Sequence, residues 1–126
     1  WRTWSWAQIF YRLGFPSELK LLLESEAITK VGVGIHNDMQ KINNDFGVNA
    51  RGYLELSDYA NAKLKSSEKW SLKGLAMNLL KENIPKDTNV RCSDWENFPL
   101  SRTQENYAAT DAYAGYAIYM KLTELQ

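Results

Sequence analysis

The sequence contains 126 residues, which is enough for one domain of ordinary size and too few for two. Fifteen Lys and Arg balance fifteen Asp and Glu, which excludes both a polycation held on nucleic acid by bulk charge and a highly charged disordered segment. A single cysteine, Cys92, excludes an internal disulfide, and the absence of an apolar run of about 18 residues predicts that no membrane is a partner.

The first residues hold a cluster of aromatic side chains. The chain begins at Trp1, and three of its five tryptophans fall within the first six residues. We therefore expect the sequence to be a piece of a longer protein. A strand that ends near residues 9–11 is predicted next, because a glycine and a proline follow it at positions 14 and 16.

Apolar spacing then predicts a helix followed by a strand. Three leucines at helical spacing follow Ser17, which is a typical helix-capping residue. Val31, Val33 and Ile35 alternate with glycines, a pattern that predicts a short buried strand. Because the glycines lack side chains, another backbone or a ligand could approach this strand closely.

A second helix and a second strand are predicted directly after it. Asn37 and Asp38 are typical helix-starting residues, and Gly47 is typical of a helix end, so a helix is predicted between them. The second strand is predicted over residues 52–56. This strand–helix–strand order favours two parallel strands joined by a crossover helix.

The second half of the chain is predicted to contain two helices separated by a long loop. Leucine spacing predicts the first helix over residues 72–80, whereas residues 81–100 show no periodicity and hold two of the three prolines. Ser101 and Gln104 form a capping box, from which a helix should run to Leu125. Strands that alternate with helices indicate an α/β domain, although two or three strands are fewer than a free-standing sheet usually has.

Two groups of side chains could carry chemistry. Asp38 follows a glycine-rich strand, at a position where open α/β sheets bind ligands and where a carboxylate can hold a divalent cation. Taken alone, that position is more typical of a charge that interacts with the helix dipole. Tyr107 and Asp111 are four residues apart, which places a phenol and a carboxylate on one helix face. An amphipathic helix with packed tyrosines and a solvated aspartate is the more ordinary explanation of this pair.

Basic and aromatic residues are interleaved in the region that precedes the last helix. Lys69 and Trp70 form one such pair, and Arg91 and Trp95 form another. We expect these four residues to contact a single-stranded nucleic acid, because cations bind phosphates and aromatic rings stack on bases. Five acidic residues between positions 68 and 96 dilute the charge, so an ordinary solvated surface explains the pattern equally well.

Taken together, these segments resemble a known family. The runs that carry the likeness are KVGVGIHNDMQKINNDFGV, LELSDYANAKL, WSLKGLAMNLL, VRCSDWENFPLS and QENYAATDAYAGYAIY, in that order. They are similar to the Werner-type 3′–5′ exonuclease domain, a ribonuclease-D-like member of the DnaQ-like (ribonuclease-H-like) superfamily. The likeness covers about residues 9–125, and residues 1–8 are atypical. We therefore interpret residues 1–126 as a single partial exonuclease domain.

The resemblance implies a fold and a set of site residues. The implied fold is a ribonuclease-H-like mixed sheet flanked by helices, with its first strands missing. The family's acidic residues come in the order Asp-x-Glu, Asp and Tyr-x-x-x-Asp. Asp38 matches the middle aspartate, and Tyr107 and Asp111 match the last block. Asp38 and Asp111 would then hold two divalent cations, Mg²⁺ or Mn²⁺, and Tyr107 would aim the attacking water.

The resemblance also implies a function, a metal-dependent 3′–5′ exonuclease that hydrolyses nucleotides from the 3′ end of DNA or RNA. No Asp-x-Glu precedes Asp38, so the family's first block is missing and we expect this fragment by itself to be inactive. The alternative is a catalytically inactive nuclease-like module that binds nucleic acid or a partner protein. Expected partners are single-stranded or 3′-recessed nucleic acid and a helicase in cis or in trans, in an intracellular location that is nuclear in a eukaryote.

Overall fold

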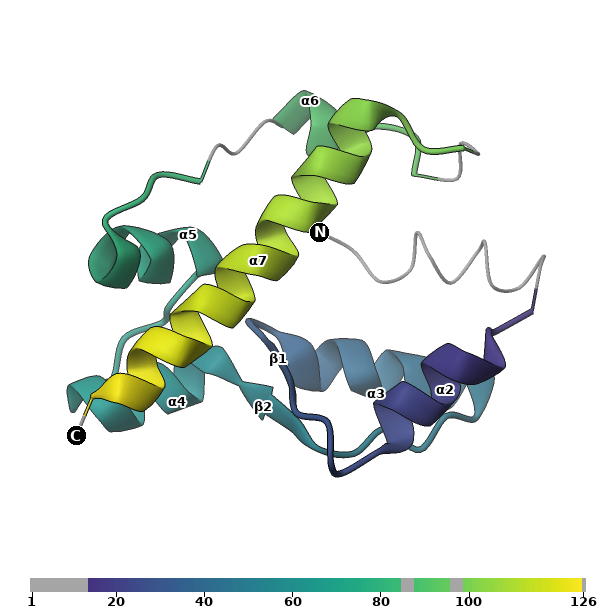
Figure 1. The fold of residues 1–126 in the computed structure, drawn as a ribbon, viewed down its shortest axis with the longest axis horizontal. Helices are drawn as coiled ribbons and strands as arrows, with labels where there is room; N and C mark the ends of the chain where they lie inside the picture. The colour runs from purple at the N-terminus through teal and green to yellow at the C-terminus, as the bar shows by residue number, and fades with distance from the viewer. Residues whose placement is uncertain (1–13, 85–87, 96–98, 126) are drawn as a thin grey trace.

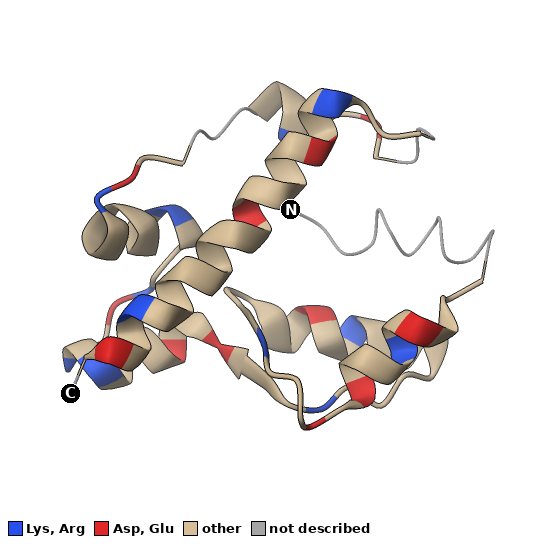
Figure 2. Cartoon of the chain, viewed as in Figure 1, with Lys and Arg blue, Asp and Glu red and all other residues tan. Residues whose placement is uncertain are grey.

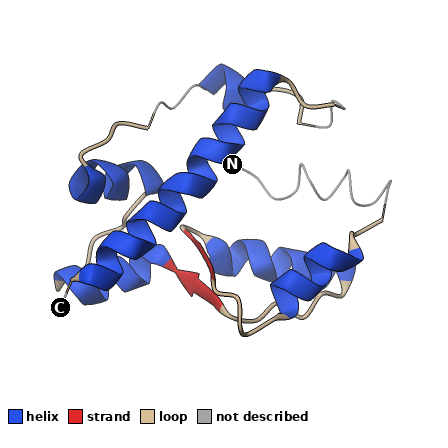
Figure 3. Cartoon of the chain, in the orientation of Figure 1, coloured by secondary structure: helices blue, strands red, loops and turns tan. Residues whose placement is uncertain are grey.

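Two short parallel strands lie beside a crossover helix in the computed structural model, which describes residues 14–84, 88–95 and 99–125 (Figures 1 and 3). Strand β1 (Lys30–Gly32) pairs with β2 (Tyr53–Glu55). Val31 lies opposite Leu54 in the parallel register. Helix α3 (Ile35–Phe46) connects the two strands, which confirms the predicted crossover. The strand predicted to end near residues 9–11 lies outside the described residues.

The first strand is shorter than its alternating valines predict. It ends at Gly32, and Ile35 is already the first residue of α3. Gly34 directly precedes the helix with φ +80°, a left-handed conformation that favours glycine. The prediction that Ile35 belongs to the strand and that Asn37 and Asp38 start the helix is therefore wrong, because the glycine turns the chain before them.

Helix α2 (Ser17–Glu24) packs against α3 through the first of two apolar clusters. Pro16 occupies the position before α2, so Ser17 begins the helix and does not cap it as predicted. The buried members of the cluster are Leu23, Ile35, Met39, Ile42, Val48 and Ala50. Ile35, Met39 and Ile42 recur at helical spacing, which explains why α3 turns its apolar face toward this cluster.

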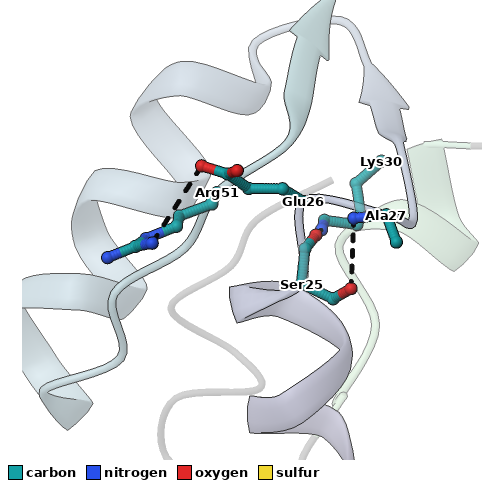
Figure 4. A network of polar contacts seen from close by, with 5 residues as sticks. All are labelled: Ser25, Glu26, Ala27, Lys30 and Arg51. Atoms are coloured by element: carbon teal, nitrogen blue, oxygen red, sulfur yellow. Dashed lines mark hydrogen bonds and ion pairs between the residues drawn. The ribbon is translucent and has the colours of Figure 1, made fainter.

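Polar contacts hold the connection between α2 and β1 (Figure 4). The Lys30 ammonium donates to the carbonyl oxygens of Leu22, Ser25 and Ile28 at 3.0, 2.6 and 2.7 Å. Desolvation by burial lowers the pKa of Lys30. The ammonium thus links the last turn of α2 to the segment that leads into β1.

Helix α4 (Leu56–Leu64) begins directly after β2 and was not predicted. The Glu55 side chain caps it by accepting a hydrogen bond from the Ser57 amide. Leu56 and Ala60 are fully buried, so tertiary packing stabilises a helix that shows little amphipathic pattern.

The helix predicted over residues 72–80 exists but changes its geometry along its length. Residues Leu72–Leu75 form α5, and Ala76–Leu80 continue as the π-helical segment η1. The Ser71 hydroxyl caps α5 by accepting a hydrogen bond from the Gly74 amide at 2.9 Å. This segment supplies Leu75 and Ala76 to the second apolar cluster.

Helix α7 (Arg102–Glu124) is the longest element and crosses the molecule diagonally (Figure 1). The predicted Ser101–Gln104 capping box is present at its start. Ile118 and Leu122 on α7 belong to the second cluster, whose other buried members are Leu56, Ala60, Leu75 and Ala76. Within the described residues, no helix is both long enough and apolar enough to cross a membrane.

Candidate active site

The N-terminal half of α7 presents Tyr107 and Asp111 to a small pocket. The pocket has a volume of about 160 Å³, and both side chains lie on its wall and are half-buried. The pocket is also lined by Ile84 and Val90, two apolar residues from the segment predicted to be a loop. That segment contains a short helix, α6 (Thr88–Arg91), whose length of one turn left no periodic pattern to detect.

Burial changes the acid–base behaviour of Asp111. Desolvation raises the pKa of its carboxyl above the ordinary value, because the ionised form loses contact with water. A carboxylate in such a pocket costs free energy at neutral pH unless a cation compensates its charge. This arrangement distinguishes Asp111 from the solvated aspartate of an ordinary amphipathic helix, and it marks a candidate functional residue.

Tyr107 packs against Trp95, which comes from the segment before α7. The two ring centroids are 6.1 Å apart with an interplanar angle of 56°. The Trp95 indole N–H donates to the Arg91 carbonyl oxygen at 3.0 Å, so α6 and Trp95 form one unit. The structure therefore places Trp95 next to Tyr107 and links it to Arg91, the other residue of this pair predicted to contact nucleic acid.

Asp38 lies in the first turn of α3 and is half-buried. Its backbone N–H donates to the Gly34 carbonyl oxygen at 3.3 Å. Helix α7 reaches β1, because a Cβ atom on Gly115 would lie 3.9 Å from the Val31 carbonyl oxygen. Asp111 is one turn before Gly115 on the same face of α7. Asp111 thus belongs to a helix that contacts β1, and Asp38 belongs to a helix that contacts the neighbouring strand β2.

Lys69 and Trp70 are not among the residues that line the pocket of Tyr107. The Trp70 indole N–H donates to the Asn61 side-chain oxygen at 3.0 Å, and the ring packs against the second apolar cluster. Ile118 belongs to that cluster and follows Tyr107 by eleven residues, which is about 16 Å along an α-helix. Figure 2 shows Lys and Arg intermixed with Asp and Glu along the chain, which fits the neutral net charge.

The described residues supply only part of a metal site. Asp38 and Asp111 offer carboxylate oxygens, the donor type that Mg²⁺ and Mn²⁺ prefer. Across residues 14–84, 88–95 and 99–125, however, no group of three or more His, Cys, Asp or Glu is placed so that it could hold a metal ion.

Fold and site together define an α/β domain of the nuclease type, and comparison identifies its family. The family model of the 3′–5′ exonuclease domain matches residues 12–125, so the chain belongs to this family. The resemblance to an exonuclease domain is confirmed. Domains of this family normally use divalent metal ions.

Two curated relatives are similar over most of the chain. The mouse bifunctional 3′–5′ exonuclease/ATP-dependent helicase WRN is 52% identical over 111 residues, covering 88% of this chain and 8% of the relative. A 3′–5′ exonuclease from Arabidopsis thaliana is 39% identical over 115 residues, covering 91% of this chain and 40% of the relative. The chain therefore spans less than half the length of either protein.

Solved structures confirm the fold. Escherichia coli RNase D superposes with a TM-score of 0.71 at 24% identity, covering 88% of this chain and 29% of that chain. Brucella melitensis NrnC, solved with pGG bound, gives a TM-score of 0.73 at 23% identity, covering 88% of this chain and 52% of that chain. The helix-rich α/β architecture with a small parallel sheet is thus the fold of the ribonuclease-D-like exonucleases.

Proposed function

We propose that this chain contributes the C-terminal part of a 3′–5′ exonuclease active site, in a protein that hydrolyses nucleotides from the 3′ end of DNA or RNA. The observation that carries the proposal is the pair on α7, where the half-buried Asp111 and Tyr107 share one pocket wall. The family membership supports the same conclusion.

The side chains have distinct roles in this proposal. Asp111 and Asp38 supply oxygen ligands for two divalent cations, Mg²⁺ or Mn²⁺, together with carboxylates from outside the described residues. Bound cations of this kind polarise a water and offset charge on the phosphate oxygens. The Tyr107 hydroxyl is a donor and acceptor that can hydrogen-bond and orient the attacking water.

The proposed substrate is a single-stranded or 3′-recessed nucleic acid. Arg91 is exposed and can reach a phosphate, and Trp95 lies beside Tyr107 and offers an aromatic surface to a base. Local contacts of this kind suit a chain of zero net charge, because metal ions and a few side chains replace a broad positive surface.

The test uses the full-length protein and a single-stranded oligonucleotide labelled at its 5′ end, with Mg²⁺ or Mn²⁺ present. Wild-type protein should shorten the oligonucleotide stepwise from the 3′ end, and Asp111→Asn should reduce the rate at least 100-fold. Glu105→Gln is the matched control, because it makes the same chemical change at an exposed position of the same helix. Equal rates for wild type and Asp111→Asn would overturn the proposal, as would binding without any hydrolysis.

The mouse relative supports a further part of the proposal, since its name couples an exonuclease to an ATP-dependent helicase. We propose that a helicase acts with this domain, in cis or in trans, and that the protein is intracellular and nuclear in a eukaryote. ATP-dependent digestion of a blunt duplex by the full-length protein and its copurifying helicase would support the link. A digestion rate that is the same with and without ATP would contradict it.

A further inference from the structure

Gln104 uses every hydrogen-bonding group of its side chain. It is 5% exposed and is the one polar residue within the described chain that is buried. Its Oε1 accepts from the Ser101 amide at 2.9 Å, which completes the capping box of α7. Its Nε2 donates to the Ser93 Oγ and to the Asp94 carbonyl oxygen, both at 2.9 Å. A capping box requires only the first of these contacts, so the other two have a different structural consequence.

The additional contacts attach the segment before α7 to the first turn of that helix. Ser93 and Asp94 directly precede Trp95, whose ring lies 6.1 Å from that of Tyr107. Gln104 and Tyr107 are three residues apart and therefore adjacent on the helix surface. A single buried amide thus connects the segment that carries Trp95 to the turn just before Tyr107.

We propose that Gln104 is a positioning residue for Tyr107. It holds Trp95 against the phenol, and the indole limits the rotation of the tyrosine side chain so that its hydroxyl keeps one direction toward the pocket shared with Asp111. The catalytic meaning of this role rests on the proposed exonuclease function. The role has an energetic basis, because displacement of a water-orienting group by about 1 Å can reduce a catalytic rate by up to about 100-fold.

Two substitutions separate helix capping from the attachment of the segment. Gln104→Glu keeps an acceptor for the Ser101 amide, and glutamate is a standard capping-box residue, but the carboxylate cannot donate to the Asp94 carbonyl. Ser101→Ala weakens the helix cap and spares the attachment. It removes the hydroxyl that accepts from the Gln104 backbone N–H at 3.1 Å, and it leaves the Gln104 side chain in place. Gln104→Met removes all the side-chain contacts at similar length.

The first readout follows Tyr107 directly and needs no nuclease activity. Full-length protein is labelled with 3-fluorotyrosine, and the Tyr107 fluorine resonance is assigned by its loss in Tyr107→Phe. We expect the resonance to move in Gln104→Glu, Gln104→Met and Trp95→Ala, and to stay in place in Ser101→Ala. An unmoved resonance in both Gln104 variants would overturn the proposal, and so would an equal movement in Ser101→Ala.

The second readout is catalytic. Gln104→Glu should lower kcat about tenfold with little change in KM, because the substrate still binds but the water is poorly aimed. In a Tyr107→Phe background the same change should cost less than twofold, since the group that it positions is gone. Equal losses in the two backgrounds would contradict the proposal. If wild-type protein hydrolyses nothing, the proposed function fails, and the fluorine resonances still decide whether Gln104 positions Tyr107.

Discussion

The Gly34 N–H donates to the Glu55 side-chain oxygen at 2.9 Å and thereby joins the turn after β1 to the end of β2. The same oxygen accepts from the Ser57 hydroxyl at 3.2 Å. One carboxylate therefore stabilises both the turn into α3, which carries Asp38, and the start of α4. A charged acceptor strengthens such hydrogen bonds relative to neutral ones.

Removing this acceptor should destabilise the fold. We expect Glu55→Ala to lower the free energy of unfolding by about 1–3 kcal/mol, because the Gly34 amide loses its partner. Urea denaturation followed by circular dichroism measures the change. The control is Glu26→Ala, which removes an exposed ion pair of 4.0 Å to Arg51 (Figure 4) and should cost less than about 1 kcal/mol. A loss at Glu55 no larger than that at Glu26 would show that the strand ends do not depend on this carboxylate.

The buried carboxyl of Asp111 should make stability depend on pH. Because burial raises the folded-state pKa, the folded protein binds the proton more tightly than the unfolded chain. Ionisation therefore costs stability as the pH rises above the unfolded value of about 4, and the full cost is present above the folded value. In the presence of EDTA, Asp111→Asn should raise the melting temperature at pH 7.5.

The advantage of Asp111→Asn should disappear as the pH falls below about 4, where the wild-type carboxyl is protonated in both states. Thermal melts across this pH range measure the difference, and Glu82→Gln serves as an exposed control. A melting temperature for Asp111→Asn equal to or below that of wild type at pH 7.5 would refute the interpretation of a costly buried charge.

Divalent cations should reverse the order of stability if Asp111 is a ligand. A cation that binds only the folded state stabilises it by mass action, and tenfold steps in concentration above Kd add about 1.4 kcal/mol each. We expect Mn²⁺ to raise the melting temperature of full-length wild-type protein and to leave that of Asp111→Asn nearly unchanged. An equal rise in both proteins would place cation binding elsewhere.

Two glycines should respond to alanine in opposite ways. A Cβ atom on Gly115 would make ordinary contacts at 3.9 Å, and alanine favours the helix, so Gly115→Ala should stabilise the protein by about 0.5–1 kcal/mol. Gly52 has φ +64°, and its Cβ atom would lie 3.1 Å from the Ser25 carbonyl oxygen. Gly52→Ala should therefore destabilise by more than about 1 kcal/mol. Urea midpoints for the pair test both signs, and equal shifts would disprove the packing described around them.

The segment before α7 should contribute to binding of single strands. We expect Arg91→Ala to weaken binding to oligonucleotides of different sequence alike, and to reduce the salt slope by about 1. Trp95→Ala should remove stacking and weaken binding further. Fluorescence anisotropy at low and high salt measures both effects, with Lys121→Ala on the far end of α7 as the control. Affinity that is unchanged at both salt concentrations would reject a role for this segment.

Local patterns accounted for much of the architecture. The capping box at Ser101 and Gln104 involves only neighbouring backbone groups, so its residues predict it directly. The same holds for Gly47, whose left-handed φ of +64° ends α3 as expected. Helix α4 escaped prediction because its cap is the side chain of Glu55, the last residue of the preceding strand, and no turn residue separates the two elements.

The sequence by itself determined the parallel strand pair, the long last helix and the family-like order of Asp38, Tyr107 and Asp111, because these depend on short-range spacing. Only the tertiary structure decided what surrounds them. Burial raises the Asp111 pKa, the Gln104 side chain donates to the Asp94 carbonyl oxygen, and the Trp95 ring lies beside that of Tyr107. These effects depend on burial and on contacts between residues that are far apart in the sequence. No local pattern of residues specifies which segment of the chain will make such contacts.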